Sequence, residues 1–222
     1  MADALIRVKI CGVTNADDAQ AAARLGADWI GLNFHPDSPR AVNRAQALEI
    51  VRAAPPSLKF AGVFVNRPAA EVDEIAAECG LSAVQLHGEE PPDDLSRLAH
   101  RRVFKAIRLG PPESIDAFAE YAAECREAGA VPFAWLLDAA HPKLRGGTGT
   151  TIPTETLAAL QPRIALGEPL ILAGGLNPEN VVAQIEALRP WMVDVASGAE
   201  AAPGRKDHAK LAAFIQAVHG AR

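Results

Sequence analysis

The strongest constraint on this fold is an alternation, repeated eight times, between a short apolar run and a longer run of helical composition. Apolar runs of five to seven residues are typical of strands that are buried on both faces of a parallel sheet. The eight strand-like runs cover residues 7–11, 28–34, 59–65, 82–87, 102–107, 133–138, 169–175 and 192–197. No long linker or change of composition divides the chain.

This alternation predicts an α/β protein, a single (β/α)8 TIM barrel that covers residues 1–222. A doubly wound open sheet is the alternative architecture. That fold usually has a glycine-rich dinucleotide fingerprint after its first strand, whereas KICGVTN contains one glycine. Helix starts are expected at Asn15, which precedes two aspartates, and at Pro178, which precedes Glu179.

Composition excludes several classes of function. The net charge is −5 and no lysine or arginine run is present, which argues against nucleic-acid binding. No apolar run approaches the ~18 residues that a membrane span needs, and no signal peptide is recognisable. The three cysteines are widely spaced, so they predict neither a disulfide framework nor a zinc site, and they fit the reducing cytoplasm.

In a barrel of this kind the reactive groups lie where strands end and βα loops begin. The candidates at these positions are Cys11, Asn33, Asn66, His87, Arg108, Asp138, Gly174, Gly175, Ser197 and Gly198.

Cys11 ends the first strand-like run. A free cysteine is often an ordinary core residue, but strand alternation places Cys11 on the same face as Lys9. We expect Lys9 to lie inside the barrel, paired with an acid such as Asp194, where its charge would favour the thiolate of Cys11. Cys79 and Cys125 lie late in helical runs and are expected to be structural.

Asp138 closes the apolar run FAWLLD. Its carboxylate could cap the following loop, or partial burial could keep it protonated for an acid role, and the sequence favours neither. His87 shares a strand face with Gln85. We expect His87 to line the site as a hydrogen-bonding residue rather than to catalyse.

Two late glycine loops, in residues 170–180 and 193–200, follow the seventh and eighth strands, where such barrels bind phosphate. Glycines that only make tight turns are the alternative. The loop GGTGTT at 146–151 lacks a nucleotide-loop ending and is expected to be an active-site loop. Arg40 in HPDSPR could bind a carboxylate through two hydrogen bonds, or it could be a solvated surface residue.

These segments together resemble the phosphoribosylanthranilate isomerases of tryptophan biosynthesis. The resemblance runs nearly end to end, and its specificity comes from the order and spacing of the motifs: VKICGVTN, GLNFHPDSPRAV, GVFVN, VQLHGEE, LLDA, GGTGT, LAGGLNPENV and VDVASGAEAAPGRKDH. Two segments depart from the family. Thr151–Pro153 stands where the family often has Phe-Asp-Trp, and Ala196 replaces a serine.

The resemblance implies a role for each matching residue. Cys11 is the general base, Asp138 the general acid and Arg40 the ligand of the anthranilate carboxylate. His87 lines the site. The loops that contain Gly174, Gly175, Ser197 and Gly198 bind the sugar phosphate, and the loop with Gly146, Gly147 and Gly149 lies alongside.

The implied reaction is the Amadori rearrangement of N-(5'-phosphoribosyl)anthranilate to 1-(2-carboxyphenylamino)-1-deoxyribulose 5-phosphate. An acid and a base suffice for it, so the resemblance implies no metal and no organic cofactor. The partners expected are a phosphorylated small-molecule substrate and no nucleic acid or membrane, for a monomer or homodimer.

Three alternatives remain open. A metal-dependent sugar-phosphate epimerase could use His35, His87 and Asp138 as ligands. A phosphate-binding barrel without turnover is the second, although the presence of both Cys11 and Asp138 argues against it. A related barrel that also acts on histidine-pathway aminoaldoses would usually carry two acidic catalysts, and Cys11 argues against that.

Overall fold

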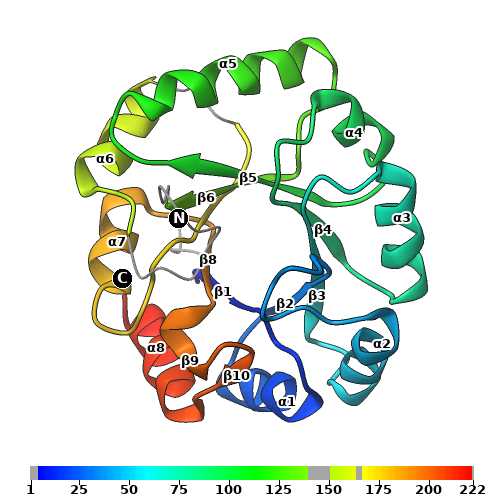
Figure 1. Cartoon of the computed structure of the whole chain (residues 1–222). Helices are drawn as coiled ribbons and strands as arrows, with labels where there is room; N and C mark the ends of the chain where they lie inside the picture. Colours follow the sequence, from blue (N-terminus) through cyan, green and yellow to red (C-terminus); the bar gives the residue numbers. More distant parts are fainter. Residues whose placement is uncertain (1–4, 140–150, 164–166, 222) are drawn as a thin grey trace.

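The computed structural model describes residues 5–139, 151–163 and 167–221. Eight parallel strands form a closed barrel in the order β1 to β8, surrounded by eight helices (Figure 1). The prediction of a TIM barrel is therefore confirmed, and the doubly wound sheet is excluded because β1 pairs with β8. The strands are β1 Arg7–Cys11, β2 Trp29–Asn33, β3 Lys59–Phe64, β4 Ala83–Leu86, β5 Val103–Leu109, β6 Ala134–Ala139, β7 Leu170–Leu172 and β8 Met192–Val195.

The helices follow the strands in regular alternation. They are α1 Ala16–Leu25, α2 Arg44–Ala53, α3 Ala69–Glu78, α4 Pro92–Arg97, α5 Ser114–Glu127, α6 Thr154–Arg163, α7 Val181–Leu188 and α8 His208–Gly220. No helix among the residues described is long and apolar enough to cross a membrane.

Two helix starts show how local chemistry sets the boundaries. Asn15 caps α1 as expected, because its side chain accepts a hydrogen bond from the Asp18 amide. The start predicted at Pro178 is wrong. The side chain of Asn177 accepts from the amides of Glu179 and Asn180, which forms a turn before α7 begins at Val181.

The barrel interior changes character along its axis. One end is filled by an apolar cluster in which the Trp29 and Phe104 rings meet edge to face, with centroids 5.3 Å apart. Lys9 on β1, Gln85 on β4 and Asp194 on β8 are buried polar residues of the barrel strands. The apolar cluster closes one end of the barrel, so that a cavity remains at the end where the strands terminate.

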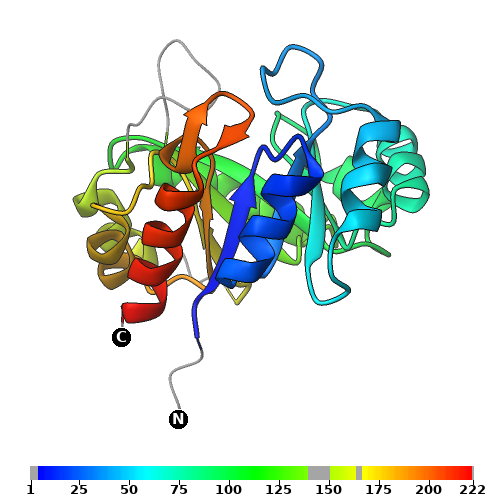
Figure 2. The same ribbon diagram turned by 90° about the horizontal axis from the view of Figure 1, so that it is seen from below.

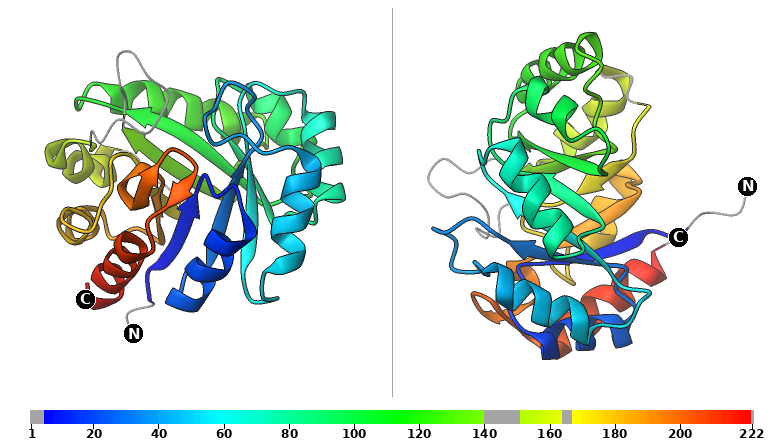
Figure 3. Two further views of the ribbon diagram at one scale, coloured as in Figure 1. Left: turned by 60° about the horizontal axis from the view of Figure 1, so that its bottom comes forward. Right: turned by 90° about the vertical axis from the view of Figure 1, so that its right-hand side faces the viewer.

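A short hairpin between β8 and α8 was not predicted. A single 3-10 turn, η1 (Ser197–Ala199), leads into β9 (Glu200–Ala202) and β10 (Arg205–Lys206), which pair antiparallel. This hairpin and the loop between β2 and α2 project from the same end of the barrel (Figures 2 and 3). Both elements contribute side chains to the cluster of charges described below.

Candidate active site

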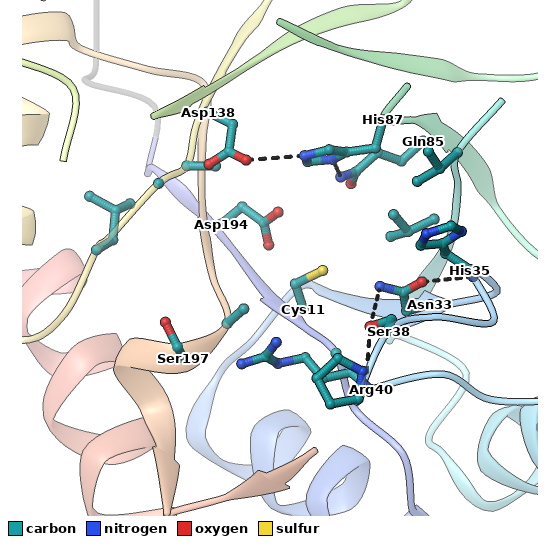
Figure 4. A pocket seen from close by; sticks show the side chains of 18 of the residues that line it. Cys11, Asn33, His35, Ser38, Arg40, Gln85, His87, Asp138, Asp194 and Ser197 are labelled. Carbon is teal, nitrogen blue, oxygen red and sulfur yellow. Dashed lines mark hydrogen bonds and ion pairs between the residues drawn. The ribbon is translucent and has the colours of Figure 1, made fainter. Parts of the chain in front are cut away.

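A cavity of about 590 Å³ opens at the carboxyl ends of the strands. Its lining includes the sequence candidates Cys11, Asn33, Arg40, His87, Asp138, Gly174, Gly175 and Ser197, together with His35, Gln85, Asp194 and Ala196. Figure 4 shows the Cys11 sulfur and the Asp138 carboxylate projecting into this cavity. The lining therefore includes most of the candidates from the sequence, and β1, β2, β3, β4, β6 and β8 all contribute residues to it.

The first feature of the site is the buried ion pair beneath Cys11. Lys9 Nζ donates to Asp194 Oδ2 at 2.7 Å, which confirms the predicted pair. Gly31 on β2 makes room for it, because a Cβ there would lie 2.7 Å from the Cys11 sulfur and 3.0 Å from Lys9 Nζ. Asp194 Oδ1 is buried and has no hydrogen-bond partner among the residues described. One carboxylate oxygen therefore holds Lys9 while the other remains available.

The electrostatic environment of Cys11 differs from the one expected. Burial raises the pKa of the Cys11 thiol, and the opposing charges of Lys9 and Lys206 only partly offset it, while Asp194 adds to the rise. Lys9 therefore acts in the expected direction, toward the thiolate, but burial outweighs it and the net pKa of Cys11 is raised. For Lys9, burial acts to lower the pKa, but Asp194 and Cys11 outweigh it, and the pKa is raised.

A hydrogen-bonded chain runs from Gln85 to Asp138. The Gln85 amide lies 2.8 Å from His87 Nδ1, and His87 Nε2 lies 3.0 Å from Asp138 Oδ2. Asp138 is buried, and its Oδ1 also accepts from the Ala139 amide. His87 thus lines the site as expected, and its specific contact is with the carboxylate that the sequence singled out.

Arg40 reaches the cavity by crossing the end of β1. Its side chain lies against Gly12, where φ is +71° and any Cβ would collide with the Arg40 side chain. Arg40 Nε and Nη2 donate to the two carboxylate oxygens of Glu200, at 2.8 and 2.7 Å. This bidentate pair raises the pKa of Arg40. Arg40 Nη1 makes no hydrogen bond within the described part of the chain, so one edge of the guanidinium stays available.

The glycine loops lie on the β7 and β8 side of the cavity. Gly174 and Gly175 have φ angles of +81° and +60° and line the cavity with Ser197. Gly198 packs against the Leu176 carbonyl and is not part of the lining. The predicted loop residues Gly146, Gly147 and Gly149 lie outside the described residues.

Two other strand-end candidates do not contribute. The side chain of Asn66 accepts from the Glu89 amide, and Arg108 is exposed with a bond to the His87 carbonyl. Cys79 and Cys125 are buried core residues, as expected. Among the residues described, no three His, Cys, Asp or Glu side chains are grouped to hold a metal ion. The ligand set of the epimerase alternative, His35, His87 and Asp138, is therefore not assembled.

Sequence reasoning missed two charged residues at the site, Glu200 and Lys206. Both are buried, and their side chains are joined at 2.9 Å. For Lys206 the available signal was the presence of charges in PGRKDH, a segment that otherwise indicates only a turn and a helix start.

Comparison with known proteins identifies close relatives. A family model described as N-(5'-phosphoribosyl)anthranilate isomerase matches residues 8–217. The chain is 45% identical over 216 residues to the protein of that name from Geobacter sulfurreducens, which covers 97% of this chain and 100% of the relative. The crystal structure of phosphoribosyl anthranilate isomerase from Thermotoga maritima superposes with a TM-score of 0.86 at 37% identity, covering 97% of this chain and 100% of the other.

A second solved structure bears on the ligand. It is a phosphoribosyl anthranilate isomerase in complex with reduced 1-(o-carboxyphenylamino)-1-deoxyribulose 5-phosphate. Its TM-score is 0.81 at 35% identity, and the alignment covers 97% of this chain and 100% of that one.

Proposed function

Since the chain belongs to the N-(5'-phosphoribosyl)anthranilate isomerase family, we propose that Cys11 is the general base and Asp138 the general acid of its reaction. The reaction is the aldose–ketose isomerisation of N-(5'-phosphoribosyl)anthranilate in tryptophan biosynthesis. The observation that carries the residue assignment is the presence in one cavity of a thiol, Cys11, and a buried carboxyl, Asp138, that is not paired with a lysine as Asp194 is.

The acid step opens the sugar ring. Asp138 donates its proton to the furanose oxygen, the C1–O bond breaks, and the anthranilate nitrogen supplies electrons to form an iminium. His87 supports this role, because the Asp138–His87 pair can hold one transferable proton between them. If the Gln85 amide is turned, its oxygen accepts from His87 Nδ1–H, which leaves Nε2 facing a protonated Asp138. The turned amide also gives a partner to Gln85 Oε1, which otherwise has none within the described residues.

The base step follows at carbon 2 of the sugar. The Cys11 thiolate removes the C2 proton, the electron pair forms the enolamine, and tautomerisation gives the ketone. A thiol whose pKa is raised is a stronger base once ionised, and the ammonium groups of Lys9 and Lys206 favour that ionised form. Acid and base groups of this kind each contribute about 10²–10⁴-fold, with positioning providing much of the rest.

Arg40 is proposed to bind the anthranilate carboxylate through the guanidinium edge that Glu200 leaves available. The backbone of Gly174, Gly175, Ser197 and Gly198 is proposed to bind the sugar phosphate, with Gly146, Gly147 and Gly149 alongside. The substrate is thus held at its two anionic ends, with the reacting carbons between them.

The test follows the fluorescence of phosphoribosylanthranilate as purified protein consumes it. Cys11→Ser should lower kcat by at least about 10²-fold, whereas Cys79→Ser, a buried thiol outside the cavity, should keep wild-type turnover. A Cys11→Ser variant with wild-type kcat would remove the base assignment. Addition of a chelator should leave the rate unchanged, and loss of activity would favour the metal-dependent epimerase.

Further proposals concern the protein as a whole. We propose a cytoplasmic location, which the three free thiols support. We also propose that residues 1–222 form one domain that acts as a monomer or homodimer. Light scattering of the purified protein measures the number of copies, and a larger assembly would contradict this.

A further inference from the structure

Lys206 lies at the joint between the first and last strands of the barrel. It is buried on β10, and its ammonium donates to three acceptors: the Cys11 carbonyl at 2.6 Å, Glu200 Oε1 at 2.9 Å and the Ala196 carbonyl at 3.1 Å. An ammonium has three protons to donate, so all of them are used. Lys206 is therefore fixed by its own bonds and in turn fixes what it touches.

Two of these acceptors end neighbouring strands. The β1–β8 ladder stops at the pair Ile10 and Val195, and Cys11 and Ala196 are the residues that follow on each strand. Lys206 bonds both of their carbonyls, so it extends the connection between the strands by one residue beyond the ladder. The main chain of Cys11 is thereby held against the strand that leads to Ser197.

Glu200, the third acceptor, connects Lys206 to the guanidinium of Arg40, which lines the cavity. Glu200 accepts from Lys206 with one oxygen and from Arg40 with both, so a single buried carboxylate joins two cations. Desolvation raises the pKa of Glu200, but Arg40 and Lys206 outweigh it, and the pKa is lowered. Glu200 therefore stays ionised and keeps Arg40 and the Cys11 backbone in one connected network.

We propose that Lys206 and Glu200 are positioning residues for the isomerase reaction, with Lys206 holding the main chain of Cys11 and Glu200 fixing Arg40 relative to it. This proposal rests on the roles proposed above for Cys11 and Arg40. The network sets the distance between the group that binds the substrate carboxylate and the group that removes the proton. A shift of either by about 1 Å is enough to cost roughly 10²-fold in rate.

The first test uses Lys206→Met, which keeps an unbranched side chain of nearly the same length and removes all three donors. Because the ammonium favours the Cys11 thiolate, the pH at which iodoacetamide alkylates Cys11 should move up. A shift of one pH unit makes labelling at neutral pH about tenfold slower. The labelled peptide is quantified by mass spectrometry. Lys105→Met is the matched control, because Lys105 is also a buried lysine that bonds a glutamate and main-chain carbonyls. It should leave the Cys11 labelling profile unchanged.

The second test is kinetic. Lys206→Met should lower kcat by about tenfold or more, and Glu200→Gln, which keeps the shape of the side chain, should chiefly raise KM by loosening Arg40. In a Cys11→Ser background Lys206→Met should add less than about twofold, since its effect acts through the sulfur-bearing residue. If Lys206→Met does not fold, Glu200→Gln and its KM decide the proposal.

An unshifted labelling profile together with wild-type kcat would overturn the positioning role of Lys206. The positioning role would also be overturned if Lys206→Met lowered kcat by the same factor in the Cys11→Ser background as in the wild type. Lys206 would then act independently of Cys11. Failure of the base assignment is distinguishable: Cys11→Ser alone would then keep its turnover, while the labelling experiment would still report whether Lys206 holds Cys11.

Discussion

Substitution of Lys9 measures how much the stability of this barrel depends on the buried Lys9–Asp194 ion pair. Lys9 is fully buried and its ammonium lies 2.7 Å from Asp194 Oδ2, while Asp194 Oδ1 has no other partner among the residues described. Lys9→Met would leave a buried carboxylate without a counter-charge. Breaking a buried pair from one side costs about 3–5 kcal/mol, so we expect the free energy of unfolding to fall by that amount.

Urea unfolding followed by circular dichroism measures this loss, and the double variant Lys9→Met/Asp194→Leu is the control. Replacing both members of a buried pair by apolar residues is often neutral, so the double variant should recover most of the stability. The pH dependence adds a second check. Because the pKa of Lys9 is raised, its contribution in the wild type is complete below the ordinary lysine value and is lost only in strongly alkaline solution.

A loss of less than about 1 kcal/mol for Lys9→Met would refute the reasoning, as would a double variant no more stable than the single one. Either result would mean that water or a shifted side chain compensates Asp194.

Three further predictions concern catalysis. Asp138→Asn should lower kcat by about 10²–10⁴-fold with little change in KM, as measured by the fluorescence assay. A variant with the wild-type kcat would refute the assignment of Asp138 as the general acid. Arg40→Ala should raise KM by about tenfold or more, through loss of a charge-assisted contact, and an unchanged KM would contradict carboxylate binding. Because burial raises the pKa of Cys11, kcat/KM should climb as the pH increases from 7 toward 9, and a flat profile would argue against a thiolate base.

The fold was largely predictable from the sequence because parallel strands that are buried on both faces appear as separate apolar runs. The Lys9–Asp194 pair was predictable for a related reason, since strand alternation puts Lys9 inside the barrel, where a cation needs a counter-charge. Much of the cavity lining was predictable because the carboxyl ends of the parallel strands meet at one end of the barrel. Cys11, His87 and Asp138 all lie where a strand meets its loop.

What the sequence could not predict depends on contacts between distant loops. Arg40 and Glu200 are 160 residues apart, and neither local sequence predicts that their side chains form a hydrogen bond. The β9–β10 hairpin is too short to show an apolar alternation, so its residues resemble a turn. The raised pKa of Cys11 was also not predictable, because the sequence reveals a neighbouring lysine but not the degree of burial, and burial dominates.

The bond between Lys206 and Cys11 has a consequence for synthesis of the chain. These residues are 195 positions apart, so the thiol leaves the ribosome long before the lysine that bonds it. An incomplete nascent chain has no β8 to pair with β1 and cannot form this part of the site. Catalytic competence should therefore arise abruptly, once the last strand and its hairpin have been translated and docked.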